Sequence, residues 1–178
     1  VLCGLMACTA STETVNPDTA PNAETSTPVS KIAVDHGFTG PFASLPKGIT
    51  SFGAAVSEDA VYLAGGYSGR PHSYSKEGQS GDLMRLNADG SWDQLAGFEP
   101  LQSVALVPVD GGVIRIGGLR AHNEAGTDAD LRSVAEVARY DAKTNTWSDL
   151  PPLPEARSSH NAVRVGDSIV VIGGWKLD

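Results

Sequence analysis

Cysteine is nearly absent from this chain: both thiols, Cys3 and Cys8, fall within the first eight of its 178 residues. The remainder therefore has no disulfide framework and no zinc or redox site built on cysteine. No segment holds the roughly 20 consecutive apolar residues that span a bilayer. Only 13 basic residues stand against 21 acidic ones, for a net charge of −8, and they form no cluster that could follow a phosphate backbone. We expect no nucleic-acid partner.

The 3.6-residue apolar period of an amphipathic helix is missing as well. In its place a glycine pair ends a short apolar strand three times, with an interval of 52 residues from Gly66 to Gly118 and of 56 from Gly118 to Gly174. Two tryptophans, Trp92 and Trp147, repeat at a similar interval of 55 residues. A period near ~50 residues with a glycine pair and an aromatic residue in each unit is typical of β-propeller blades. The pairs are Gly65 and Gly66, Gly117 and Gly118, and Gly173 and Gly174.

Each unit predicts a set of antiparallel strands. A small or apolar run leads through an acidic or glycine turn to the strand that ends at the glycines. After a long polar stretch comes a third strand, and a short turn then leads to a fourth strand that carries the tryptophan. The first three predicted strands are 52–56, 61–64 and 82–86 in the first unit and 104–107, 113–116 and 136–140 in the second; the third unit supplies 161–165 and 169–172.

The junction of the second and third units resembles a kelch repeat. The resemblance rests on the run 139–147 with Tyr140 and Trp147, on 150–154, on Arg157 and His160, and on the final glycine pair. The first unit departs from the pattern, because Leu86 stands where Tyr140 stands and its turn to Trp92 is one residue shorter. The resemblance implies an all-β fold of four-stranded antiparallel blades, here forming an incomplete ring. It also implies that Tyr140 and Trp147 fill the space between blades and that Arg157 and His160 have structural roles.

The chain divides into three predicted parts. Residues 1–8 resemble the end of a bacterial lipoprotein signal, in which Cys8 is the lipidated residue. The polar segment 9–36 lacks the apolar surface needed for folding, so we expect a disordered linker. We expect residues 37–178 to be a portion of a propeller, with a closing outermost strand at 42–46, two full blades and the first half of another. From the signal-like segment we predict that the protein is exported to the cell envelope, where it is attached to the outer membrane or faces the periplasm. We expect it to contact a membrane only through its lipid anchor.

Binding residues are expected on the face that carries the long loops. In an antiparallel blade the second-to-third loops and the links between blades share one end, and here these are the long segments. The candidates are Arg70, His72, Arg120, His122 and Trp175, which follow the glycine pairs. Ordinary solvated loops are the alternative, and we predict no metal site. The opposite, short-turn face is expected to lack any pocket.

Three functions fit this reading. The first is a module that binds a protein or a carbohydrate through the long-loop face, without a cofactor. The second is suggested by resemblance to exported bacterial kelch propellers that are sialic acid mutarotases, because mutarotation needs only modest acid–base help. The third, a galactose-oxidase-like copper enzyme, needs a cysteine joined to a tyrosine, and no cysteine follows Cys8. We favour the binding module, and the sequence leaves the oligomeric state open.

Overall fold

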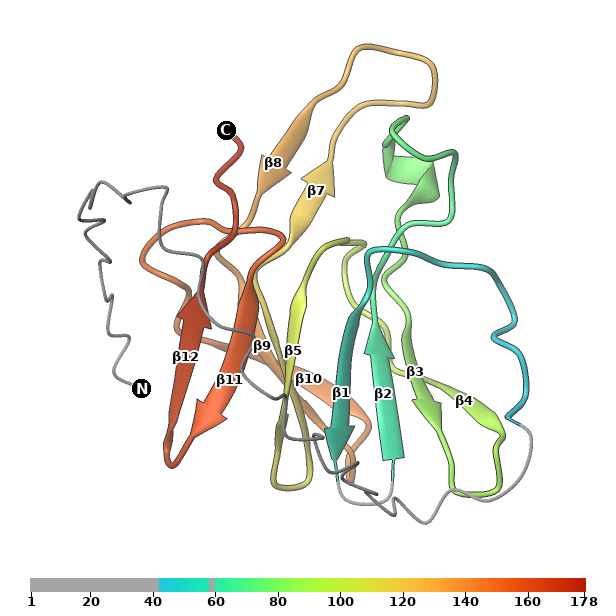
Figure 1. Cartoon of the computed structure of the whole chain (residues 1–178), viewed down its shortest axis with the longest axis vertical. Helices are drawn as coiled ribbons and strands as arrows, with labels where there is room; N and C mark the ends of the chain where they lie inside the picture. The colour runs from blue at the N-terminus through green and yellow to red at the C-terminus, as the bar shows by residue number, and fades with distance from the viewer. Residues whose placement is uncertain (1–41, 58–59) are drawn as a thin grey trace, which may run out of the picture.

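The computed structural model describes residues 42–57 and 60–178, and nearly all its regular structure there is β-strand (Figure 1). Over the described residues, two four-stranded antiparallel sheets and a two-stranded sheet follow one another along the chain, and a second two-stranded sheet lies within a loop of the second four-stranded sheet. The all-β fold class with four-stranded antiparallel sheets is thereby confirmed. Sheet I contains β1 (Gly53–Ser57), β2 (Ala60–Ala64), β3 (Leu83–Leu86) and β4 (Trp92–Leu95); sheet II contains β5 (Ala105–Val109), β6 (Gly112–Ile116), β9 (Val137–Asp141) and β10 (Thr146–Leu150); sheet III contains β11 (Asn161–Val165) and β12 (Ser168–Ile172).

The predicted signal segment 1–8, its Cys8 and the linker 9–36 lie outside the described residues. Residues 42–49 are described without an assigned strand. Ala43 donates its amide to the Gly90 carbonyl at 2.9 Å, so this segment runs beside the turn that leads into β4. The closing strand stays a prediction.

The glycine pairs allow the chain to pass closely from one sheet to the next. Gly65 and Gly117 have φ values of +64° and +55°, which other residues rarely adopt. A Cβ atom on Gly65 would collide with the Leu101 carbonyl oxygen, and one on Gly117 would lie 2.5 Å from that of Arg157. The amides of Gly66 and Gly118 donate to these same two carbonyls, at 2.8 Å each. Each pair thus joins its own sheet to the segment entering the next.

The core lies between the sheets. Sheets I and II enclose Tyr62, Leu83, Leu101 and Tyr140, each at most 5% exposed. Trp147 packs against this cluster, with its ring centroid 5.4 Å from that of Tyr140. Sheets II and III enclose a purely aliphatic cluster, to which sheet II contributes Ala105, Val107, Ile114 and Ile116. Radially arranged blades bury their side chains in this way, between neighbouring sheets.

Both tryptophans occupy the predicted fourth strands and anchor themselves in the same manner. The Trp92 indole N–H donates to the Ala43 carbonyl at 2.8 Å, and that of Trp147 donates to the Ala96 carbonyl at 2.7 Å. In each case the acceptor belongs to a segment that precedes the tryptophan's own sheet. The 55-residue spacing therefore reflects equivalent positions in successive units.

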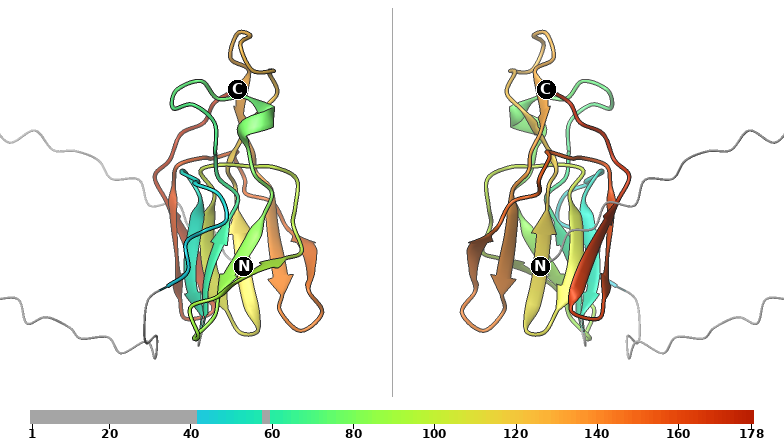
Figure 2. Two further views of the ribbon diagram at one scale, coloured as in Figure 1. Left: turned by 90° about the vertical axis from the view of Figure 1, so that its right-hand side faces the viewer. Right: turned by 90° about the vertical axis from the view of Figure 1, so that its left-hand side faces the viewer.

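The two ends of the sheets differ. Short turns join first to second strands in sheets II and III and third to fourth strands in sheets I and II at one end, the short-turn face. Segments 67–80 and 119–133 rise beyond the strands at the other end, the long-loop face (Figure 2). The second segment is a hairpin of β7 (Leu119–Ala121) and β8 (Leu131–Ser133) where the sequence predicted only a loop. The first contains a short 3₁₀ turn at Lys76–Gly78. Both expected loops are thus ordered.

Candidate functional site

Segment 67–80 is organised around one tyrosine. Tyr67 is 3% exposed, donates its hydroxyl to the Ser73 carbonyl at 2.6 Å and packs edge-on against Tyr74 with ring centroids 5.0 Å apart. The backbones of Gly69 and Gly78 press so closely on its ring that a Cβ atom on either would collide with it. The loop therefore holds its shape through internal packing.

The hairpin β7–β8 and segment 67–80 are bonded to each other, and we call them the paired loops. The Lys76 amide donates to the Asn123 carbonyl at 3.0 Å, and the Asn123 side-chain amide donates to the Tyr74 carbonyl at 2.9 Å. An ion pair joins Lys76 Nζ to Glu124 at 2.9 Å, although both side chains are well exposed and the pair adds little stability. Because most of these contacts involve backbone groups, they fix the position of one loop against the other.

Three of the five predicted binding residues lie exposed on the paired loops. Arg70 and His72 are exposed on the first loop, where His72 has a φ of +61°, and His122 is exposed on the hairpin. Arg120 is half-buried instead and forms an ion pair with Glu136 at 2.9 Å. Trp175 follows β12, where it exchanges two backbone hydrogen bonds with Ser158, and its carbonyl accepts from the Ser133 hydroxyl of β8 at 3.1 Å; the residue is 69% exposed. The structure therefore places Arg70, His72 and His122 on the paired loops and gives Arg120 an internal partner.

A buried arginine at this end of the sheets escaped the sequence analysis. Arg115 on β6 is 4% exposed, lies 4.8 Å above the Phe98 ring and shares Glu136 with Arg120, its own contact being 3.4 Å. Burial lowers the pKa of Arg115, because the charged form loses its hydration. Arginine within the apolar strand before the glycine pair is the one signal that could have indicated this ion cluster.

A cavity of about 480 Å³ opens between the first strands of the three sheets. Ser51, Ser103 and Ser159 line it, one from each unit, at the same position just before the first strand. None of the five predicted binding residues is among its described lining residues. Repetition at intervals of 52 and 56 residues is the signal that could have identified these serines.

The three serines share an unusual backbone conformation with a common cause. Their φ values are +55°, +55° and +53°, a left-handed region that serine seldom occupies. The turn directs the Ser103 amide to the Ser51 carbonyl at 2.6 Å and the Ser159 amide to the Ser103 carbonyl at 3.0 Å. These bonds offset the cost of the turn and link the units around the cavity.

Arg157 and His160 lie where a structural role is expected of them. Arg157 donates from Nη1 to the Gly173 carbonyl at 3.0 Å and forms an ion pair with Glu155 at 3.1 Å. His160 is 6% exposed, and its Cε1 would lie 2.7 Å from a Cβ atom on Gly117. Burial, and then the charge of Arg157, lower the pKa of His160 and favour the neutral ring. The structural role of both residues stays a prediction.

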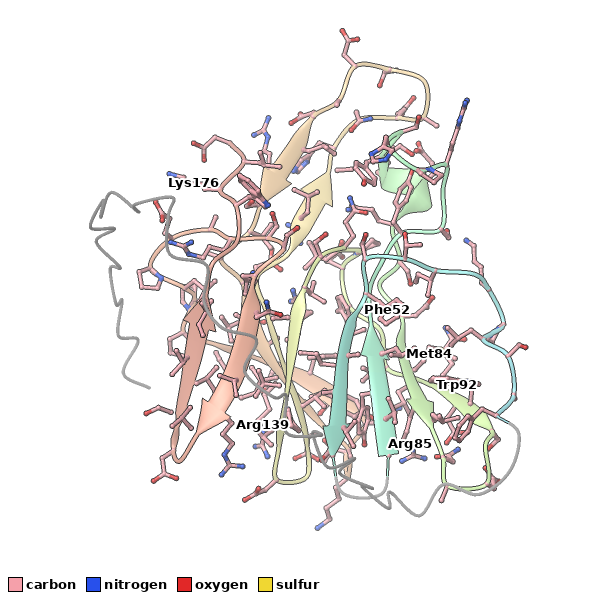
Figure 3. The ribbon with its side chains drawn as sticks, in the orientation of Figure 1. Phe52, Met84, Arg85, Trp92, Arg139 and Lys176 are labelled. Carbon is pink, nitrogen blue, oxygen red and sulfur yellow. The ribbon has the colours of Figure 1, made fainter. Side chains whose placement is uncertain are left out.

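The short-turn face is not as featureless as the sequence analysis expected. A groove of about 280 Å³ between sheets II and III is lined by Asp110, Arg139, Arg164 and Asp167 among others. A second, of about 360 Å³, separates sheets I and II beside Arg85. Figure 3 shows Arg85 and Arg139 towards this end and Lys176 towards the other. The expectation of no pocket here is wrong, because a groove lies between each pair of neighbouring sheets at this end.

Within 42–57 and 60–178 no three histidine, cysteine, aspartate or glutamate side chains gather as a cation site would require. No helix over these residues is long and apolar enough to cross a bilayer.

Comparison with known proteins identifies the repeats. No family model matches the chain. The Kelch repeat protein M-T8 of Myxoma virus is 43% identical over 127 residues, covering 71% of this chain, and the Kelch-like protein terF of Aspergillus terreus is 30% identical over 127 residues, covering 68%. This chain spans only 21% and 26%, respectively, of the lengths of these two relatives.

A solved structure gives the same result at the level of the fold. The structure titled "Structure of YjhT" superposes with a TM-score of 0.59 at 20% identity, over 76% of this chain and 37% of that one. Together with the three glycine-ended strands and the paired tryptophans, these similarities show that the chain belongs to the kelch-repeat family.

Proposed function

We propose that the chain is part of a kelch propeller that acts as a binding module and recognises a protein through the paired loops. The observation that carries the proposal is the set of contacts joining segment 67–80 to β7–β8, because they hold exposed side chains from two sheets in fixed relative positions. A surface ordered in advance loses less conformational entropy on binding than two mobile loops would.

The shape and chemistry of the paired loops favour a protein over a small molecule. They project beyond the strands, whereas small ligands are usually enclosed in concave sites (Figure 2). Their exposed side chains include a cation at Arg70, an imidazole at His72 and a carboxylate at Asp128, and such a mixture fits the polar rim of a protein interface.

Site-specific photocrosslinking in cells tests this proposal. A photoreactive amino acid in place of His72 or His122 is expected to yield a crosslinked protein adduct, identified by mass spectrometry. The matched control is the same substitution at Lys143, which is exposed in the turn before β10 on the short-turn face. Adducts from Lys143 alone would move the binding surface to that face and refute the proposal.

A carbohydrate-active role, such as mutarotation of sialic acid, is the second candidate, and the serine-lined cavity favours it. Three hydroxyl groups around about 480 Å³ provide donors and acceptors of the kind that bind sugar hydroxyls. Titration with N-acetylneuraminic acid, followed by NMR, would then shift the Ser103 amide more than that of Lys143. Equal or absent shifts would rule out this sugar as a ligand of the cavity.

Attachment to the cell envelope through Cys8 is a further part of the proposal, supported by the small apolar residues that precede this cysteine. The protein is expected to partition with detergent in phase separation, and Cys8→Ala is expected to move it to the aqueous phase. Cys3→Ala serves as the control and should leave partitioning unchanged. A Cys8→Ala protein that stays with the detergent would disprove the anchor.

A further inference from the structure

At the base of the paired loops, one side-chain amide makes the hydrogen bonds to the edge of β7 that a neighbouring strand would otherwise make. Gln79, at the end of segment 67–80, donates from Nε2 to the Leu119 carbonyl at 2.8 Å and accepts from the Ala121 amide through Oε1 at 2.8 Å. These two groups belong to β7, on the edge that faces away from β8. A side-chain amide offers one donor and one acceptor, so it can satisfy both as a strand would.

The same contact recurs one unit further along the chain with different atoms. Ser133 donates its backbone amide to the Leu177 carbonyl at 2.9 Å, and its hydroxyl accepts from the Leu177 amide at 3.0 Å. Gln79 and Ser133 occupy equivalent positions. The Gly65 amide donates to the Asp82 carbonyl and the Gly117 amide to the Glu136 carbonyl, and Gln79 and Ser133 each lie three residues before the acceptor of their own unit. Two chemically different residues therefore fasten one unit to the next from equivalent positions.

The contact made by Gln79 is the lowest of a series that runs up the paired loops. Above it lie the backbone bond from Lys76 to Asn123 and the bond from the Ala125 amide to the Glu77 carboxylate at 3.1 Å. Lys76, Glu77 and Ala125 in the upper contacts are exposed, so water competes for their groups, whereas Gln79 is half-buried, as is Asn123.

We infer that Gln79 is a positioning residue that makes the paired loops a single element, so that opening of one loop at its base loosens the other. The inference deepens the proposed function, because it assigns the geometry of the binding surface to one amide. The test of this inference uses the free protein without a binding partner. Its outcome is therefore independent of the crosslinking experiment that tests the proposed function.

Hydrogen exchange of the full chain, resolved by NMR, tests the inference with Gln79→Leu, which keeps the bulk of the side chain and removes both bonds. The Ala121 amide is expected to exchange about tenfold faster, and those of Lys76 and Ala125 severalfold faster. The matched control is Gln94→Leu, since Gln94 bonds to Asp82 within sheet I at 2.9 Å. This control should change the exchange rates of these three amides less than twofold.

The Val113 amide on the buried strand β6 serves as the reference for global unfolding. Unchanged exchange at Ala121 would overturn the inference. Faster exchange at Ala121 with no change at Lys76 and Ala125 would overturn it too, because the loops would then open independently. A uniform rise that includes Val113 also counts against it, since a positioning role requires Ala121 to exceed the reference.

Discussion

The interface between sheets I and II and the interface between sheets II and III are filled by different kinds of side chain. The first contains Tyr62, Tyr140 and Trp147 together with the buried charge of Arg115. The apolar cluster of the second is formed by alanine, valine, isoleucine and leucine side chains, and a groove lined by Arg139 and Arg164 opens beside it at the short-turn end. Both interfaces nevertheless have the same glycine-supported passage from one sheet to the next, which indicates that this passage, and not the kind of side chain, defines the repeat.

Among the substitutions that test this difference between the interfaces, Trp147→Ala is expected to lower the free energy of unfolding most. Removing the indole deletes contacts with Phe98 and Tyr140 at ring distances of 5.2 and 5.4 Å and leaves the Ala96 carbonyl without its donor. The free energy of unfolding should fall by about 3 kcal/mol in urea denaturation. Trp92→Ala, outside the aromatic cluster, should cost about 1 kcal/mol. Equal losses would show that the aromatic filling contributes nothing of its own.

Gly117→Ala is expected to cost about 2 kcal/mol, because the new Cβ meets the Arg157 carbonyl at 2.5 Å in a left-handed backbone. The control is Gly173→Ala, at the same position of the third unit. There φ is +71° and nothing lies within 4 Å of an added Cβ, so about 1 kcal/mol of backbone strain is expected. Thermal denaturation of the 178-residue chain measures both. Indistinguishable losses would mean that close passage does not explain the glycine.

Arg115→Leu should leave the free energy of unfolding unchanged or raise it by up to about 1 kcal/mol. The corresponding residue of sheet I is Leu63, and Glu136 keeps its contact with Arg120 at 2.9 Å. Replacing a poorly satisfied buried charge with an apolar side chain often has this outcome. Glu136→Gln is the contrasting variant, expected to cost about 1–2 kcal/mol because it leaves two arginines without a carboxylate. A marked loss with Arg115→Leu would make the ion cluster a stabilising feature of the first interface.

His72→Ala and His122→Ala should have the smallest effect, within about 0.5 kcal/mol, because both side chains are exposed. Chemical denaturation of each variant beside Trp147→Ala measures the difference. A loss comparable with that of Trp147→Ala would place these histidines in the core rather than on the binding surface.

Much of the fold was predictable because it repeats. The predicted strand 61–64 agrees with β2 to within one residue, the strand 82–86 begins one residue before β3, and the strand 136–140 is shifted from β9 by one residue at both ends. Strand length, turn chemistry and the glycine pairs all indicated the same arrangement, and such agreement is what specifies a fold.

The features that escaped prediction depend on contacts between units. β7 and β8 are three residues each, too short for an alternating pattern to stand out. The pairing of Arg120 with Glu136 and the two bonds of Gln79 to β7 join residues whose proximity only the folded chain reveals. Of the predicted binding residues, those at loop tips could be placed on the long-loop face from the sequence, but the ion pair of Arg120 with Glu136 could not be foreseen.

The serine contacts around the inner cavity have a direction. In both, the amide belongs to the later unit and the carbonyl to the earlier one: Ser103 to Ser51, and Ser159 to Ser103. Such a contact is heterologous, joining two different surfaces of equivalent modules, as in a head-to-tail ring of subunits. If a unit were inserted in reverse orientation, its serine amide would face the amide of one neighbouring unit and its serine carbonyl the carbonyl of the other, and neither hydrogen bond could form. The polarity of the backbone at one serine per unit thus allows each unit only one way of joining its neighbours.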